Sequence, residues 1–460
     1  MKKRTIDMTQ GNIFKTLIKF TIPIIIANVL QTLYSAADMI VVGKFAGKES
    51  LAAVGSTTPA INIMITVFIG MSSASNVIVA RKFGAGNKAG VEKAMHTAMA
   101  LCIVGGIVLA FAGVFLSKSI LTLMNCPADV INLSVLYMRI YCLGIPAMLL
   151  YNFGSAITRA LGDSRRPTYY LAASGLINVA LNLVLVIGFE MGVAGVAIAT
   201  ITSQIISATL VVINLRRFDE ETRLSMRKIR FYGNELREML LLGIPAGIQS
   251  SIFTFSNLII QSSINSCGSA TMAGNSAGSS VENIFYVATS AFFHSIITFM
   301  GQNIGAKRFD RIKKGYWVGF SSAGALGLVL SAVLILFAEP LVSIYTDSKE
   351  AIQIGAERII IIGGTQFLCG LMEVAAGALR GIGVASRSMI TCLIGVSGVR
   401  LLMNWIGAPF ANPEDLKILY YSYPISWILT TVALTVSFFS IVNSRERKWK
   451  EKLAMKENKF

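Results

Sequence analysis

The stretch 28–43 (NVLQTLYSAADMIVVG) places a carboxylate, Asp38, inside an otherwise apolar segment. On a helix, Gln31, Tyr34 and Ser35 would share the face of Asp38, because they precede it by seven, four and three residues. An acid at membrane depth costs about 2.5–3.5 kcal/mol on insertion scales, so it persists where it is paired, protonated or in contact with water. We therefore predict a functional site at Asp38, with Gln31 and Tyr34 as candidates for lining a substrate cleft. The alternative is a structural hydrogen bond to a neighbouring helix.

Two further acids lie within apolar segments of the sequence. Glu282 is followed one turn later by Tyr286, and it either faces a cleft or lies near an interface. Glu373 either takes part in function or pairs with an intramembrane arginine such as Arg400. All three candidates, Glu282, Tyr286 and Glu373, are predicted to line the substrate cleft.

Polar side chains also recur at helical spacing within apolar segments. Asn178 and Asn182 are four residues apart and would share one face, and Thr200 belongs to a polar run in the next segment. Polar residues in spans often join helices. Amide and hydroxyl oxygens beside one carboxylate would alternatively suit a hard cation. A third polar face, with Asn257 and Gln261, either lines a wet cleft or packs against another helix.

The elements that must position these residues are membrane-spanning helices. Of the 460 residues, 54% are hydrophobic and 14% are charged, and the mean hydropathy is +0.65. A soluble domain has about 25% charged residues. Apolar stretches near the ~20 residues that cross a bilayer recur along the chain. We predict an all-α polytopic membrane protein with twelve transmembrane helices, at approximately 17–42, 52–80, 94–116, 133–158, 168–189, 193–214, 239–265, 271–300, 317–338, 354–379, 388–407 and 420–443.

Basic residues are distributed unevenly among the connections between these segments. The two termini and every second connection together hold 33 of the 41 Lys and Arg residues. Because cytoplasmic loops are enriched in Lys and Arg, we predict a multi-pass protein of the plasma (inner) membrane with both termini in the cytoplasm. The net charge of +17 then reflects orientation rather than nucleic-acid binding. The remaining basic residues are assigned to the outer side: Lys44, Lys48, Lys118, Arg139, Lys349, Arg358, Arg400 and Lys417.

The two halves of the chain repeat at an offset of 221 residues, which pairs 159–166 (RALGDSRR) with 380–387 (RGIGVASR). Six spans per repeat is an even number, so both halves enter the membrane from the same side. This predicts two six-helix bundles related by a pseudo-two-fold axis along the membrane normal, with substrate in the cleft between them. An amphipathic cytoplasmic helix is expected in the polar connection, with its basic residues facing anionic headgroups. The predicted parts are an N-terminal six-helix lobe (1–214), a cytoplasmic linker (215–238) and a C-terminal six-helix lobe (239–460).

The sequence lacks the patterns of common catalytic sites. The glycines near residue 86 follow no strand, which argues against a nucleotide loop, and no Walker lysine is present. The six cysteines form no CxxC pair, and His96 and His294 are isolated. We therefore predict a protein that is not an enzyme and has no cofactor. Since the repeat supplies both walls of a cleft, we expect a functional monomer.

Taken together, these features resemble the multidrug and toxic compound extrusion (MATE) family. The resemblance covers nearly the whole chain. Its segments are QTLYSAADMIVVGKFAG, GAGN, RALGDSRRP and INVALNLVLVIGFEMGVAGVAIATITSQ. It implies a cation-coupled antiporter that expels amphipathic, often cationic compounds by alternating access.

The resemblance also implies roles for individual residues. Asp38 corresponds to the family's aspartate that binds the coupling proton or sodium ion, and Asn178 and Thr200 correspond to the asparagine and threonine of the same site. The family commonly has aspartate at the position of Asn182, so one charge is missing and the coupling ion stays open. NorM-like members have a second-half ion site whose glutamate has no counterpart here, so that site is either absent or rebuilt around Glu373.

A second interpretation keeps the fold and changes the cargo to a lipid-linked sugar or another amphipathic metabolite. Many flippases of this kind have further spans and several arginines in the cleft. Few basic residues lie within the twelve predicted segments, which favours drugs or small organic cations as substrates, with membrane lipids as the other partners.

Overall fold

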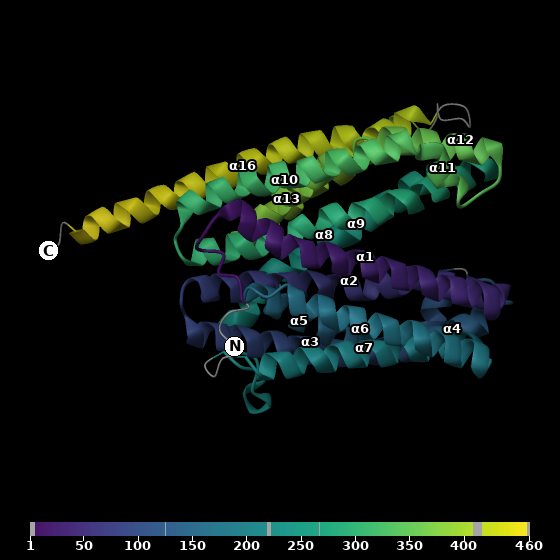
Figure 1. Ribbon diagram of the computed structural model, residues 1–460, viewed down its shortest axis with the longest axis horizontal. Coiled ribbons are helices and arrows are strands. Elements are labelled where there is room, and N and C mark those ends of the chain that lie inside the picture. Colours follow the sequence, from purple (N-terminus) through teal and green to yellow (C-terminus); the bar gives the residue numbers. More distant parts are fainter. Residues whose placement is uncertain (1–4, 125, 219–221, 266, 408–415, 458–460) are drawn as a thin grey trace. The chain divides into compact units, whose positions relative to one another are not determined.

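The protein is described by a computed structural model, in which the placed residues contain helices and no strand (Figure 1). The described residues are 5–124, 126–218, 222–265, 267–407 and 416–457. The helices of the first half are α1 (Ile13–Phe45), α2 (Lys48–Gly84), α3 (Lys88–Leu123), α4 (Ile131–Leu143), α5 (Ile145–Ala160), α6 (Arg165–Asn182), the π-helical segment η1 (Leu183–Gly188) and α7 (Gly192–Arg216).

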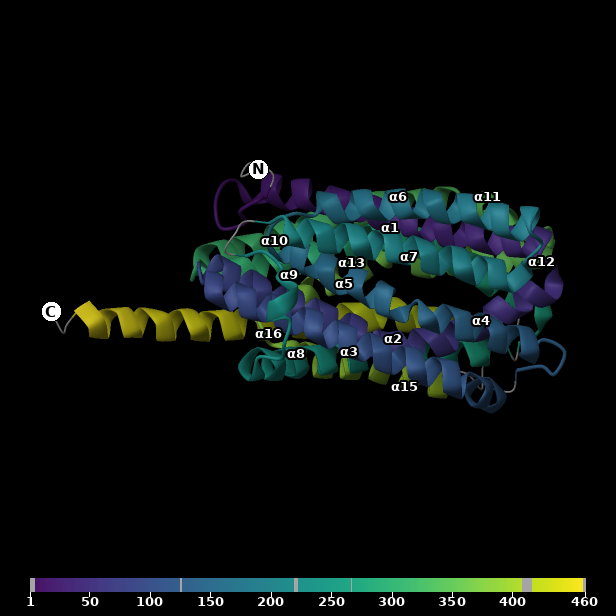
Figure 2. The same ribbon diagram turned by 90° about the horizontal axis from the view of Figure 1, so that it is seen from below.

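The second half follows a short 3-10 turn, η2 (Met226–Lys228). Its last helix, α16, continues past the other helices of its own unit in both views (Figures 1 and 2). The elements are α8 (Gly233–Asn265), α9 (Ser269–Gly305), α10 (Phe309–Leu336), α11 (Ala338–Ser343), α12 (Lys349–Arg358), η3 (Ile359–Gly363), α13 (Gln366–Gly381), α14 (Ala385–Cys392), η4 (Leu393–Gly398), α15 (Val399–Gly407) and α16 (Lys417–Glu457).

The prediction of twelve spans agrees with the helices. Within the described residues, ten helices are long and apolar enough to cross a membrane, and two bent pairs raise the number to twelve if each pair is one span. The pair α4 and α5 bends by 45°, and η3 and α13 meet at a bend of 42°. Pro146 opens α5 and has no N–H to donate to the preceding turn, which explains the first bend.

The internal repeat appears in the lengths and breaks of the helices. α1 and α8 each have 33 residues and contain one proline, Pro23 or Pro245. Gly162 and Gly383, which the offset of 221 pairs, both have positive φ, 92° and 84°. A side chain on Gly162 would also overlap the Ile6 carbonyl, so this turn requires glycine for two reasons.

Within the described parts of the chain, three π-helical segments interrupt the α-helices. In η1, the N–H of Phe189 donates to the carbonyl of Val184, five residues earlier, and Gly364 donates to Ile359 after η3 in the same way. Such segments are rare and are frequent at functional sites. η1 begins directly after Asn182, and η3 directly after Arg358. η4 ends two residues before Arg400.

Contacts divide the chain into two units, which we describe separately. The first contains Ile22–Gly247, and the second contains Ile248–Phe460 together with the early segment Asp7–Thr21. These units are defined by contacts between residues. The predicted lobes, 1–214 and 239–460, were defined by the sequence repeat, and their boundaries stay a prediction.

The prediction of an amphipathic helix in the linker is wrong for its described part. Only η2 is helical between Thr222 and Tyr232. Side chains of α3 hold this segment instead, because the N–H of Ser225 donates to His96 Nε2 at 3.0 Å and the N–H of Tyr232 donates to Thr97 Oγ1 at 3.2 Å. His96 is buried and has a structural role here. Hydrogen bonds to α3 thus position the described part of the linker.

Candidate functional sites in the two units

The first unit brings Asp38 of α1 to the end of α6, an arrangement that we name the Asp38 site. Asn182 Nδ2 donates a short hydrogen bond to Asp38 Oδ1 and lies 3.4 Å from Asn178 Oδ1. Asn178 and Asn182 are buried. Asn182 Oδ1 is also buried and has no hydrogen-bond donor among the described residues. A carboxylate and an amide oxygen without a donor make a set of oxygens suited to a hard cation or a proton.

The close approach of α1 to α6 positions Asp38. Gly175 has no side chain, and the ring of Tyr34 fills the space that a Cβ would take. The Tyr34 hydroxyl donates to the carbonyl of Ala172 at 3.1 Å. Tyr34 is thus a packing contact between the two helices, one turn before Asp38.

We expect Gly175→Ala to lower the melting temperature of the purified protein. The new methyl group would overlap the Tyr34 ring, and overpacking of this kind costs about 1–3 kcal/mol. Thermal unfolding in detergent measures the change. Gly55→Ala is the matched control, because a methyl group on Gly55 meets no atom within 4 Å. Equal melting temperatures for the two variants would contradict the packing argument.

Among the described residues, neither Thr200 nor Gln31 forms a hydrogen bond with the Asp38 carboxylate. The Thr200 hydroxyl donates to the Val196 carbonyl in its own helix at 2.9 Å. Gln31 is exposed. Tyr137 and Tyr141 on α4 lie within electrostatic range of Asp38, and neither was predicted as part of this site. Their spacing of four residues within a predicted span was the available signal.

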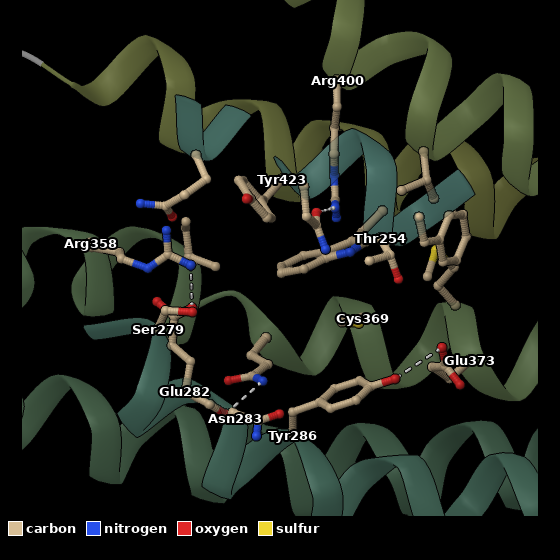
Figure 3. Close-up of a pocket in the computed structure, with 18 residues that line it drawn as sticks. Thr254, Ser279, Glu282, Asn283, Tyr286, Arg358, Cys369, Glu373, Arg400 and Tyr423 are labelled. Carbon is tan, nitrogen blue, oxygen red and sulfur yellow. Dashed lines mark hydrogen bonds and ion pairs between the residues drawn. The ribbon is translucent and has the colours of Figure 1, made fainter. Parts of the chain in front are cut away.

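A cavity in the second unit brings together the five predicted second-half candidates, Asn257, Gln261, Glu282, Tyr286 and Glu373. Figure 3 labels Glu282, Tyr286 and Glu373 among the residues that line it. We name it the Arg400 cavity. Its volume is about 370 Å³, within the usual range for small-molecule sites. Helices α8, α9, α12, α13, α15 and α16 and the segments η3 and η4 contribute its lining.

One wall of the cavity is a buried ion pair. Arg358 donates to Glu282 Oε2 at 2.8 Å and to Asn275 Oδ1 at 2.7 Å, and Asn275 donates to Gln261 Oε1 at 2.7 Å. The Gln366 amide donates to the Glu282 carbonyl oxygen at 3.2 Å. An apolar cluster that includes Ala356 and Ile359 on either side of Arg358 holds this wall in place.

The second charged wall is Arg400, which Figure 3 shows on the side opposite Glu282 and Tyr286. Arg400 donates to Ser426 Oγ at 3.0 Å and to Asn257 Oδ1 at 3.1 Å. Its guanidinium lies 4.1 Å from the centre of the Tyr423 ring.

Arg358 and Arg400 are both buried within helices, so neither is a loop charge, and their assignment to the outer side stays a prediction. Counting charges per connection cannot separate a loop residue from one inside the end of a span. The pairing of Glu373 with Arg400 is also not observed. Within the described part of the chain, Glu373 instead accepts a hydrogen bond from the Tyr286 hydroxyl at 3.4 Å (Figure 3).

Comparisons with known proteins place these sites in context. The sequence profile of the MatE family matches residues 23–184 and 245–406, one stretch in each half and more than half of the chain. The probable multidrug resistance protein YoeA of Bacillus subtilis is 27% identical over 443 residues, covering 91% of this chain and 95% of that protein. The FAD transporter of Shewanella oneidensis is 23% identical, covering 91% and 93%.

Solved structures agree with these matches. A structure described as the outward-facing conformation of a multidrug resistance MATE family transporter has a TM-score of 0.91 at 19% identity, covering 97% of this chain and 100% of that one. This similarity confirms the predicted fold. The two profile matches confirm that the chain has two repeated halves.

Proposed function

Because the chain belongs to the MATE family of multi-pass membrane transporters, which are not enzymes, we propose that it is a cation-coupled exporter of amphipathic organic compounds. The observation that carries the proposal is the contact of Asp38 with Asn182, whose buried oxygen Oδ1 has no donor among the described residues. The name of the B. subtilis relative supports drug-like cargo.

Coupling would depend on the charge of Asp38. Binding of a proton or a sodium ion neutralises the carboxylate, so the acid no longer needs water or the Asn182 amide. α1 can then pack differently against α6 while the cargo leaves on the outer side. A cation that moves into the cell gains about 2.3 kcal/mol per 100 mV of membrane potential. Proton and sodium ion both fit this scheme.

Efflux of a fluorescent organic cation from proteoliposomes tests the coupling step. We expect the wild type to respond to a proton gradient or to a sodium gradient, imposed separately, and Asp38→Asn to respond to neither. The amide keeps the size of the side chain and cannot change charge, so gradient-driven efflux should fall to the passive rate. Dye retention over time gives the rate.

Asp129→Asn is the matched control, because Asp129 is an exposed acid outside the helices. It should transport like the wild type. Unchanged gradient-driven efflux in Asp38→Asn would overturn the assignment of Asp38.

A second candidate is export or flipping of a lipid-linked or other amphipathic metabolite on the same fold. The buried Arg358 and Arg400 favour it, since the sequence argument for cationic cargo depended on few basic residues within the spans. Failure of either gradient to move the dye in the wild type, together with transport of an anionic compound, would favour this candidate. In either case we propose that one chain acts as a monomer among membrane lipids, because each half contains its own site.

A further inference from the structure

The Arg400 cavity contains a positive charge that no acid of the described chain neutralises. Arg400 is 5% exposed, and its hydrogen-bond partners, Asn257 and Ser426, are neutral. Among the described residues, no carboxylate forms an ion pair with it. Tyr423 and Trp427 stack near the guanidinium, at 4.1 Å and 5.4 Å from the ring centres.

The two acids of the cavity have other partners. Glu282 pairs with Arg358 at 2.8 Å, and Glu373 accepts from the Tyr286 hydroxyl. These acids also differ from Arg400 in kind. A carboxylate in an apolar site can become neutral by taking up a proton, whereas a guanidinium stays protonated in proteins. Arg400 therefore keeps its charge in every state of the cavity.

A buried charge is unfavourable unless it is paired. Stacking on aromatic rings and hydrogen bonds to neutral oxygens offset part of this cost. The remainder makes the cavity selective for a partner that brings a negative charge. We propose that the Arg400 cavity binds the carboxylate or phosphate group of an aromatic amphipathic compound, with Arg400 as the anion-binding residue.

The aromatic side chains that line the cavity are the reason for proposing an aromatic compound. Phe253, Tyr286, Tyr423 and Trp427 surround the same space of about 370 Å³. Planar rings stack favourably on such side chains. An arginine fork binds carboxylate or phosphate through two parallel hydrogen bonds. A cationic cargo would instead meet the guanidinium of Arg400, which is unpaired within the described chain, since Arg358 is already paired with Glu282.

The inference rests on the proposed function, because the cavity matters physiologically only if cargo passes through it. Its test is an equilibrium measurement that needs no gradient. Failure of dye efflux would therefore leave the binding result interpretable, and failure of binding would leave the Asp38 site untouched.

Equilibrium dialysis of the full chain in lipid nanodiscs would compare matched probes. The carboxylate pair is 1-naphthaleneacetate and its neutral amide, and the phosphate pair is riboflavin 5′-phosphate and riboflavin. We expect the anion of at least one pair to bind roughly tenfold more tightly than its neutral partner, the scale of one charged hydrogen bond. The pair that responds identifies the anionic group. Equal binding within both pairs would overturn the proposal.

Variants of the chain test whether the preference for anionic probes depends on Arg400. In Arg400→Gln the anion preference should disappear, and in Arg400→Lys part of it should remain. Asn257→Asp provides a second test that keeps the arginine, because the new carboxylate would pair with it at the position of Asn257 Oδ1. This variant should also lose the preference, by roughly tenfold, with binding of the neutral probes unchanged.

Arg139→Gln is the control for loss of a positive charge, because Arg139 is an exposed arginine of the first unit. Its anion preference should equal that of the wild type. An undiminished preference in Asn257→Asp, or tighter binding of a cationic naphthalene amine than of naphthaleneacetate in the wild type, would overturn the assignment even if Arg400→Gln failed to fold.

Discussion

Replacing Glu282 with glutamine is expected to destabilise the second half by about 3–5 kcal/mol. The substitution removes the only carboxylate that forms an ion pair with Arg358 among the described residues, and both side chains are less than 10% exposed. A single buried charge without its partner is much costlier than either the intact pair or no pair. Thermal unfolding of the purified protein in detergent would measure the loss as a lower melting temperature.

A double variant separates the pair from the individual residues. Glu282→Gln with Arg358→Gln should lose less stability than the sum of the two single variants, because no uncompensated charge remains. Asp310→Asn is the matched control, since the pair of Asp310 with Arg308 is exposed and such pairs contribute about 0–1 kcal/mol. If the loss of stability in the double variant equalled the sum of the losses in the two single variants, Glu282 and Arg358 would not stabilise the fold as a pair.

Replacing Arg311 with glutamine is expected to release the segment Asp7–Thr21 from the second unit. Arg311 is buried and donates to the carbonyls of Met8, Gln10 and Gly11 at 2.8–3.0 Å. Hydrogen bonds to charged groups contribute about 1.5–3 kcal/mol each, and glutamine could replace one of them at most. The local loss should therefore exceed about 3 kcal/mol. Hydrogen exchange of the Met8 amide, which donates to Gln302 at 3.0 Å, would report it.

Arg308→Gln is the control for this prediction. Arg308 lies three residues earlier, and its side chain is exposed and pairs only with the exposed Asp310 among the described residues. It should leave exchange at Met8 unchanged. Equal protection of Met8 in Arg311→Gln and the wild type would mean that Gln302 and Asn303 hold the segment without the arginine.

The spans could be predicted because the cost of placing polar groups in a bilayer is large and acts on every residue. The Asp38 site could be predicted in part for the same reason, since an isolated acid in an apolar run is conspicuous. The spacing of Asn178 and Asn182 predicted that both side chains lie on one face of the helix, and they do. Tyr137 and Tyr141 were missed because their relation to Asp38 depends on how α4 packs, which no local pattern contains.

The Arg400 cavity was harder to predict. Its polar residues were identified one by one, but Arg358 and Arg400 were not recognised as part of the same cavity, and the argument for cationic cargo came from the small number of basic residues within the predicted spans. Their burial depends on partners far away in the sequence, such as Glu282 for Arg358. The repeat offset places Tyr137 at the position of Arg358 (358 − 221 = 137). The two halves therefore share a scaffold and differ in the chemistry at equivalent positions.

The π-helical segments have a consequence for comparing this chain with its relatives. A wider turn shifts the angular phase of every residue that follows it, so a face counted in steps of three and four ends where such a segment begins. In α6 that count ends at Asn182, and in α12 it ends at Arg358. Deleting one residue within Leu183–Gly188 would close the wide turn to α-helical geometry and leave the direction of the following side chains unchanged, because a π-helical turn holds one residue more than an α-helical turn. One-residue gaps in an alignment at these three places would thus record the gain or loss of a wide turn, while the side chains that follow keep their directions.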